Sequence, residues 1–331
     1  MAGRRRKKSG GRSYAWRYRG RIVACVFVEV IIICALVIMI GWNKGVKEWF
    51  EQFEQPVLKE VDISGINSPN AILMQARGGK ILGEINGEAQ IYPASMTKIM
   101  TVILGIENFD DLDEKITLTN EMFTGLYEQD ATQAGFQPGE EVRVIDLLYG
   151  AMLPSGAECC IALADTISGS EADFAELMNK KARKLGMENT HFCDSTGLHN
   201  PDHYSTVKDI AVLMKYCIKN DTFREIVETS RHSTGVTNIH PDGITYYSTM
   251  FKNLSDPTVT GGKILGGKTG YTSEAGHCLV SFAEIEGREY IFGSAGASGA
   301  DGNTIPHIQD AVTVYNRVGA AIEAKMNDNN K

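Results

Sequence analysis

Hydrophobic and polar positions divide the chain into an apolar N-terminal run and a longer region of mixed pattern. Residues 22–41 are apolar except for Glu29, and a helix of that length spans a bilayer. Residues 43–59 carry aromatic and aliphatic side chains at helical spacing, which predicts an amphipathic helix beside the run. We therefore expect four parts: a basic cytoplasmic tail at 1–21, a transmembrane anchor at 22–42, a juxtamembrane linker helix at 43–64 and a folded domain at 65–331.

Within the folded domain, strand patterns occur at both ends and helical patterns lie between them. Short strands are predicted at 71–75, 80–85, 262–267, 278–284 and 290–295. Helices are predicted after residue 99 and at 145–152, 159–167, 174–185 and 305–324. One more is opened by Ser205 as N-cap, with Thr206 and Asp209 as an approximate capping box. This order favours an α/β fold. In it, an antiparallel sheet built from both ends of the domain is flanked by helices, with an inserted all-helical lobe. A cleft between sheet and lobe is the natural place for a site.

Charge is distributed very unevenly along the chain. Residues 1–21 hold nine Lys/Arg and no acid, so subtracting +9 from the net charge of −8 leaves −17 for the remainder. The strongly negative charge of the region after residue 21 argues against nucleic acid as a partner. Basic residues on the N-terminal side of the apolar run predict a cytoplasmic N-terminus and an extracytoplasmic domain, in a single-pass cell-membrane protein. A cleaved signal peptide is the alternative, but no small-x-small cleavage pattern follows the run.

Cysteine and histidine positions point to no metal or cofactor. The chain has seven cysteines, an odd number without the spacing of a disulfide framework, and a Cys193–Cys278 bridge is the one pairing left open. His199 and His203 have the spacing of zinc ligands on a helix, but they flank an Asn-Pro-Asp turn. We expect neither a metal site nor a cofactor.

Ser95 and Lys98 are the first candidates for catalysis. They lie three residues apart, just after Pro93 and ahead of an apolar helical pattern, so they share one face of a helix at its first turn. A serine hydroxyl needs a neighbouring base to become a nucleophile, and a desolvated lysine can be that base. The pattern alone is weak, because on the order of one chance match is expected in a chain of this length. Ser205 and Lys208 are a second match.

Two later motifs support Ser95. Ser155-Gly156-Ala157 directly follows a helix-breaking proline, and Lys268-Thr269-Gly270 lies in a predicted strand with further glycines on its N-terminal side. Glycines in a strand allow another backbone to approach closely. The ordered set Ser-x-x-Lys, Ser-Gly-x, Lys-Thr-Gly is far more specific than any one member.

These motifs make the chain resemble the penicillin-binding serine acyltransferases, and most closely the low-molecular-mass, serine-type D-alanyl-D-alanine carboxypeptidases. The resemblance covers roughly residues 65–327 and implies a β-lactamase/transpeptidase-like fold. The residues that carry it are Tyr92-Pro93-Ala94-Ser95-Met96-Thr97-Lys98-Ile99-Met100-Thr101, Asp146-Leu147-Leu148-Tyr149, Ser155, Tyr204-Ser205-Thr206 and Gly267-Lys268-Thr269-Gly270-Tyr271-Thr272.

The resemblance implies a peptidoglycan stem peptide ending in D-Ala-D-Ala as substrate and β-lactams as covalent inhibitors. Ser95 would be the nucleophile, Lys98 its base, and Lys98 or Ser155 the proton donor to the leaving D-alanine. The substrate-binding residues would be Lys268, Thr269, Gly270 and Tyr271. Among these, Lys268 and Thr269 would hold the terminal carboxylate, while the backbone N–H groups of Ser95 and Tyr271 would bind the oxyanion.

Two departures from the family pattern bear on activity. Ala157 stands where the family usually has an asparagine, and residues 300–303 lack the arginine that many members place beyond the last strand. Two other functions therefore stay in view. One is a β-lactamase of the same fold, for which Glu158 would activate water; the other is a non-catalytic β-lactam or muropeptide receptor.

Overall fold

The computed structural model describes residues 58–254, 256–299 and 305–329, which belong to one compact unit, Val57–Lys331. The predicted basic tail, the predicted anchor and residues 43–57 of the predicted linker helix lie outside these ranges. Within them, no helix is both long and apolar enough to cross a membrane. Residues 58–64, expected to end the linker helix, form no helix. Instead, Leu58, Val61 and Ile63 are buried in a hydrophobic cluster of the folded domain.

The central sheet combines strands from both ends of the domain. It has the order β2-β1-β10-β9-β8-β7, and the strand pairs are antiparallel. The strands are β1 (Asn70–Gln75), β2 (Ile81–Ile85), β7 (Thr258–Val259), β8 (Gly262–Thr272), β9 (Gly276–Ile285) and β10 (Arg288–Ala297). The N-terminal β1 pairs directly with the late strand β10. The predicted construction of the sheet from both ends is therefore confirmed.

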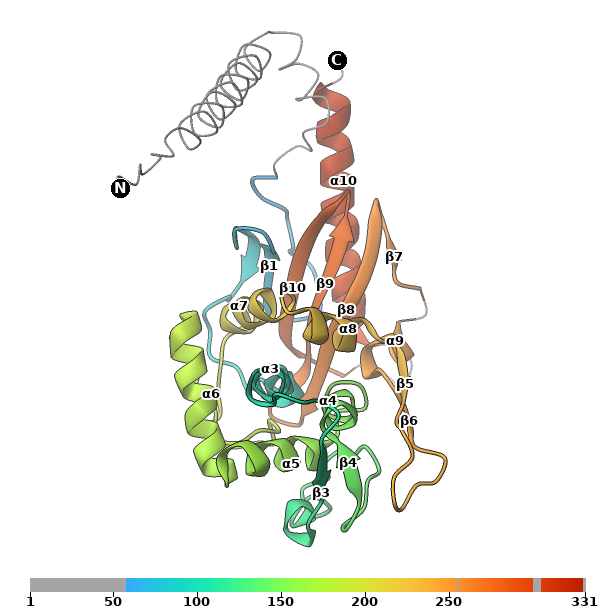
Figure 1. Cartoon of the computed structure of the whole chain (residues 1–331). Helices are drawn as coiled ribbons and strands as arrows, with labels where there is room; N and C mark the ends of the chain where they lie inside the picture. Colours follow the sequence, from blue (N-terminus) through green and yellow to red (C-terminus); the bar gives the residue numbers. More distant parts are fainter. Residues whose placement is uncertain (1–57, 255, 300–304, 330–331) are drawn as a thin grey trace, which may run out of the picture. The chain divides into compact units, whose positions relative to one another are not determined.

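The two faces of the sheet pack against different helices, because side chains alternate along each strand. On β1, Ala71 and Leu73 join the cluster on α10 (Pro306–Asn329), whereas Ile72 and Met74 join the larger cluster of the helical lobe. Figure 1 shows α10 along one side of the sheet and the lobe on the other.

The lobe contains most of the helices predicted from periodicity. Its helices are η1 (Ala94–Thr97, a 3-10 turn), α3 (Lys98–Asn108), η2 (Asn120–Phe123, also 3-10), α4 (Val144–Met152), α5 (Ala157–Ser168), α6 (Glu171–Leu185), α7 (Val207–Cys217), α8 (Asp221–Glu228) and α9 (Thr249–Asn253). The expectation of an all-helical lobe is wrong in one respect. Two short hairpins interrupt it, β3 (Lys115–Thr117) with β4 (Glu141–Arg143) and β5 (Arg231–Ser233) with β6 (Thr245–Tyr247).

Two local predictions need correction. The N-cap of α7 is Thr206, whose side chain accepts a hydrogen bond from the backbone N–H of Asp209. The predicted N-cap, Ser205, is therefore one residue too early. Ser205 instead pairs with Ile91 in an isolated bridge. The open Cys193–Cys278 pairing is also wrong, since both cysteines are free.

Candidate active site

Ser95 and Lys98 lie at the junction of η1 and α3. The predicted first helical turn is a 3-10 turn, in which Ser95 is half-buried, and the α-helix begins at Lys98 itself. Ala94, just before the serine, has a φ of +47°, a left-handed conformation that costs a non-glycine residue energy and is concentrated at functional sites. The turn is fixed by packing from both sides: Ala94 and Met96 are buried.

The Lys98 amine is directed at the serine. Its Nζ atom lies 3.1 Å from Ser95 Oγ and donates a 2.7 Å hydrogen bond to the backbone carbonyl of Thr196. Only 3% of Lys98 is exposed. Burial lowers the pKa of the Lys98 amine, against smaller opposing contributions from Cys160 and nearby carboxylates. A lysine with a lowered pKa is the kind of base that Ser95 requires.

Ser155 and Lys268 form a second pair beside the first. Lys268 Nζ donates to Ser155 Oγ at 3.0 Å and to the carbonyl of Thr269 at 2.9 Å, and Lys268 is 1% exposed. Burial, together with the charge of Lys98, lowers the pKa of Lys268 well below its ordinary value. Ser155 has a φ of +75°, so its hydroxyl is presented from a strained turn just before α5.

The glycines around Lys268 allow this chain's own backbone and side chains to pack closely on β8. A Cβ on Gly270 would lie 3.0 Å from Ser95 N and 3.2 Å from Pro93 O, while one on Gly266 would lie 2.4 Å from Val227 O. The Lys-Thr-Gly strand is thus pressed against the turn that carries Ser95. The backbones that approach these strand glycines closely belong to the segment around η1 and to α8.

Thr269 and Tyr271 follow Lys268 along the same strand. The Thr269 hydroxyl lies 2.6 Å from that of Thr249, and Tyr271 is 61% exposed, with its ring 4.6 Å from the His277 ring. The structure thus places all seven candidate residues on η1, α3, the turn before α5 and β8, with Ser95–Lys98 and Ser155–Lys268 in direct contact.

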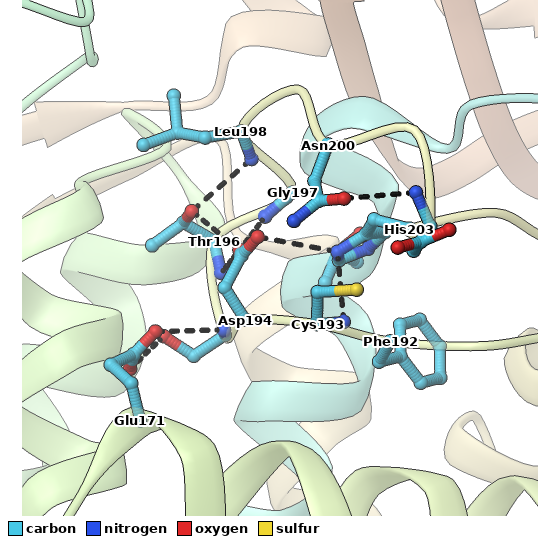
Figure 2. A network of polar contacts seen from close by, with 12 residues as sticks. Glu171, Phe192, Cys193, Asp194, Thr196, Gly197, Leu198, Asn200 and His203 are labelled. Carbon is cyan, nitrogen blue, oxygen red and sulfur yellow. Dashed lines mark hydrogen bonds and ion pairs between the residues drawn. The ribbon is translucent and has the colours of Figure 1, made fainter.

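A loop at residues 191–206 contacts Lys98, and sequence reasoning assigned a place in the site neither to its Asp194 nor to its Thr196. It supplies the Thr196 carbonyl that binds Lys98. Figure 2 shows the polar network within it, in which the Asp194 carboxylate accepts hydrogen bonds from the loop and faces His203. A small hollow next to η1 is lined by residues of both segments, Tyr92, Pro93, Ala94, Gly197, Leu198, His199, Asn200 and His203, with Thr272 of β8. The only sequence signal for Asp194 and His203 is that they shortly precede Tyr204-Ser205-Thr206, one of the stretches that carry the family resemblance.

Weaker sequence candidates have structural roles. Ser205 is fully buried and hydrogen-bonds Thr190, while Lys208 forms an ion pair with Glu88, so this second Ser-x-x-Lys match forms no site. His199 and His203 make contacts to different carboxylates rather than to one common point. In the part of the chain that the structure describes, no cluster of three or more His, Cys, Asp or Glu could hold a metal ion.

Glu158 and Ala157 begin α5 next to Ser155. Glu158 is fully buried, its Oε1 accepts hydrogen bonds from the backbone of Ala134 and Gly135, and burial raises the pKa of its carboxyl. Through these bonds it ties a neighbouring loop to α5. Ala157 is 1% exposed and brings no polar side-chain atom to the site. Residues 300–303, which lack the family arginine, lie outside the described ranges.

Comparisons with known proteins agree with this arrangement. A family model described as D-alanyl-D-alanine carboxypeptidase matches residues 57–298. The chain is 35% identical over 219 residues to D-alanyl-D-alanine carboxypeptidase DacF of Bacillus subtilis, covering 65% of this chain and 54% of the relative. It is 35% identical over 236 residues to a D-alanyl-D-alanine carboxypeptidase of Streptomyces sp. strain K15, covering 69% of this chain and 78% of the relative. The chain thus spans about half the length of several curated relatives that it matches.

Solved structures show the same fold. The Streptomyces K15 DD-transpeptidase superposes with a TM-score of 0.69 at 29% identity, covering 79% of this chain and all of that one. A D-alanyl-D-alanine carboxypeptidase from Mycobacterium tuberculosis H37Rv, at 22% identity and a TM-score of 0.69, covers 81% of this chain and 96% of its own and shows the fold alone. With a matching family model over most of the chain and the three motifs gathered at one site, the chain belongs to the D-alanyl-D-alanine carboxypeptidase family.

Proposed function

We propose that this protein is a serine D,D-carboxypeptidase that removes the terminal D-alanine from peptidoglycan stem peptides through a Ser95 acyl-enzyme. The observation that carries the proposal is the buried Lys98 amine, 3.1 Å from the Ser95 hydroxyl oxygen. This distance is within reach for direct proton transfer. The lowered pKa of Lys98 increases the fraction of neutral amine that can accept the proton at neutral pH.

In the proposed reaction, Ser95 Oγ attacks the carbonyl carbon between the two D-alanines while its proton passes to Lys98 Nζ. The backbone N–H groups of Ser95 and Tyr271 stabilise the oxyanion. The C–N bond then breaks, and the proton returns to the leaving amine from Lys98, directly or through Ser155. Water adds to the acyl-enzyme, releases the shortened peptide and restores the Ser95 hydroxyl.

Lys268 and Thr269 are proposed to hold the substrate's terminal carboxylate. An ammonium in a buried site is a strong charge-assisted donor to a carboxylate, and Thr269 offers a half-buried hydroxyl on the same strand. Binding an anion next to Lys268 would also offset the effect of the Lys98 charge, which lowers the pKa of Lys268.

The two other functions are less well supported. A β-lactamase needs fast hydrolysis of the penicilloyl-enzyme, but the candidate Glu158 is fully buried and bound to a backbone loop. A non-catalytic muropeptide receptor would not need the aligned Ser95–Lys98 pair, and a β-lactam receptor would be acylated without turning over a D-Ala-D-Ala peptide. Release of D-alanine from a pentapeptide ending in D-Ala-D-Ala tests the proposal. Without such release from the full-length protein the carboxypeptidase function is refuted, and rapid turnover of nitrocefin would favour the β-lactamase.

Membrane attachment belongs to the same proposal. The apolar run at 22–41, preceded by nine basic residues, supports an N-terminal anchor with the catalytic domain outside the cytoplasm. That location would bring the site to peptidoglycan, its proposed substrate.

A further inference from the structure

The carbonyl of Thr196 controls how the Lys98 amine is oriented. A neutral amine has two N–H groups and one lone pair, and proton transfer requires the lone pair to face Ser95. The hydrogen bonds of Lys98 Nζ that join it to the described residues go to Ser95 Oγ and to the Thr196 carbonyl. Ala157 offers no side-chain acceptor, so the Thr196 carbonyl is what fixes the rotation of the amine.

Asp194 shapes the backbone that presents this carbonyl. Its Oδ1 atom accepts hydrogen bonds from Thr196 N, Thr196 Oγ1 and Gly197 N, all at 2.7 Å. Burial alone would raise the pKa of Asp194, but the hydrogen-bonding and electrostatic interaction with His203, together with hydrogen bonds from Thr196 and Gly197, outweighs it and lowers the pKa to about 2. The carboxylate is therefore an anion at neutral pH, and three donors converge on one of its oxygens.

The turn held by Asp194 packs closely against η1, the turn that carries Ser95. Gly197 has a φ of +80°, and a Cβ there would lie 1.9 Å from the carbonyl oxygen of Ala94. Glycine is needed for both reasons, the left-handed conformation and the close backbone contact. The position of Thr196 is thereby set relative to η1 as well as to Lys98.

His203 connects Asp194 to the helix that carries Lys98. Its Nε2 atom is 2.9 Å from the hydroxyl of Thr97, while its Nδ1 atom is 3.3 Å from Asp194 Oδ2 and 3.2 Å from Cys193 N. His203 is 2% exposed. Thr97 directly precedes Lys98, so the contacts run from Lys98 through the Thr196 turn, Asp194 and His203 back to the neighbouring residue. Figure 2 shows the part of this chain from Thr196 through Asp194 to His203.

We propose that Asp194 and His203 are positioning residues for acylation of Ser95: they hold the Thr196 carbonyl against Lys98 Nζ and so direct the lone pair of that amine at the Ser95 hydroxyl. This inference rests on the proposed function, because it assigns a role within the Ser95 acyl transfer. A positioning role belongs to the step in which the proton moves. It predicts an effect on the acylation rate constant and little effect on the affinity of the preceding complex.

The test is the acylation of full-length protein by a fluorescent penicillin, with the acylation rate constant and the dissociation constant of the non-covalent complex measured separately. Asp194→Ala should lower the rate constant about 10- to 100-fold. A loss of that size is expected when charge-assisted hydrogen bonds that stabilise the transition state are removed. Its dissociation constant should stay within about threefold of the parent's. Asp194→Asn keeps an oxygen for the three donors and should recover part of the lost rate.

Asn179→Ala is the matched control. Asn179, on α6, makes two 2.8 Å hydrogen bonds to the backbone of Phe192 in the same loop, and neither of them involves Thr196. It should lose stability while keeping the parent acylation rate. If the acylation rate of this control falls as much as that of Asp194→Ala, the proposal is overturned. The rate would then depend on the rigidity of the whole loop and not on the position of the Thr196 carbonyl.

A folded Asp194→Ala protein that acylates at the parent rate would also overturn it. If that variant does not fold, Asp194→Asn and His203→Gln decide the matter. Parent rates in both variants refute the positioning role, and reduced rates with an unchanged dissociation constant support it. Failure of the proposed function is distinguishable, because it is read from D-alanine release by the unmodified protein, whereas the positioning role is read from the acylation rates of the variants.

Discussion

Replacing Gly270 with alanine tests how closely β8 must fit against η1, the turn that carries Ser95. The added Cβ would lie 3.0 Å from Ser95 N, 3.1 Å from Ala94 Cβ and 3.2 Å from Pro93 O. Ordinary contacts between such atoms begin near about 3.5 Å, so η1 and β8 must separate by about 0.5 Å. The Ser95 N–H, proposed as an oxyanion donor, would move with η1.

The substitution should lower both stability and activity. Overpacking costs about 1–3 kcal/mol, and the lower entropy of the unfolded chain after a Gly→Ala change returns about 0.4–1 kcal/mol. The net loss of stability is therefore about 0–2.5 kcal/mol. A 1 Å misplacement of reacting groups costs about 100-fold in rate, so half that displacement should slow acylation by about tenfold.

Gly293→Ala is the matched control for this change. Gly293 is also a strand glycine, but its Cβ would meet Ile72 Cγ2 and Val207 O at 3.4 Å, close to ordinary contact distance. Acylation by a fluorescent penicillin and thermal unfolding should be measured for both variants. The reasoning is refuted if Gly270→Ala acylates at the parent rate, or if Gly293→Ala slows acylation equally.

Three further predictions follow from other parts of the chain. Ala157→Asn should increase the acylation rate by roughly 10- to 150-fold if the new amide bonds the lysine or substrate in the transition state; an unchanged or lower rate in a folded variant would show that the site is built around alanine. Burial and the neighbouring His277 lower the pKa of His307 to about 4 from its usual 6.5. The unfolded chain therefore binds more protons in this window, and acidification from pH 6.5 to about 4 should remove up to about 3 kcal/mol of stability. Denaturant unfolding of His307→Phe should show a flatter pH profile, and an identical profile would exclude this residue as the cause. Protease added outside intact cells should digest residues 43–331, whereas protection until lysis would reverse the proposed orientation.

Strong local patterns explain how much of the fold could be predicted. The strands at both ends of the domain were recognisable as short apolar runs bounded by turn residues, and the helices as apolar positions three and four residues apart. The hairpins β3–β4 and β5–β6 have strands of three residues each, too short to show a period. The N-cap of α7 was misplaced by one residue because Ser205 and Thr206 are both good capping residues.

The candidate site divides in the same way. Ser95, Lys98, Ser155 and Lys268 could be grouped from the sequence because their motifs occur in a recognisable order. Asp194 and His203 could not, since an aspartate and a histidine nine residues apart in a loop follow no period and match no spacing rule. Their relation to Lys98 runs through a backbone carbonyl, and the identity of Thr196 carries no sign of it.

The most direct test of the central claim is to locate the covalent adduct. The full-length protein is incubated with a penicillin, digested and mapped by mass spectrometry, beside the Ser95→Ala and Ser205→Ala variants. We predict one adduct with the mass of the intact β-lactam, on the peptide that contains Ser95. It should be absent from Ser95→Ala and unchanged in Ser205→Ala, because Ser205 is fully buried. An adduct on a peptide that lacks Ser95, or one that persists in Ser95→Ala, would contradict the assignment of Ser95 as the nucleophile.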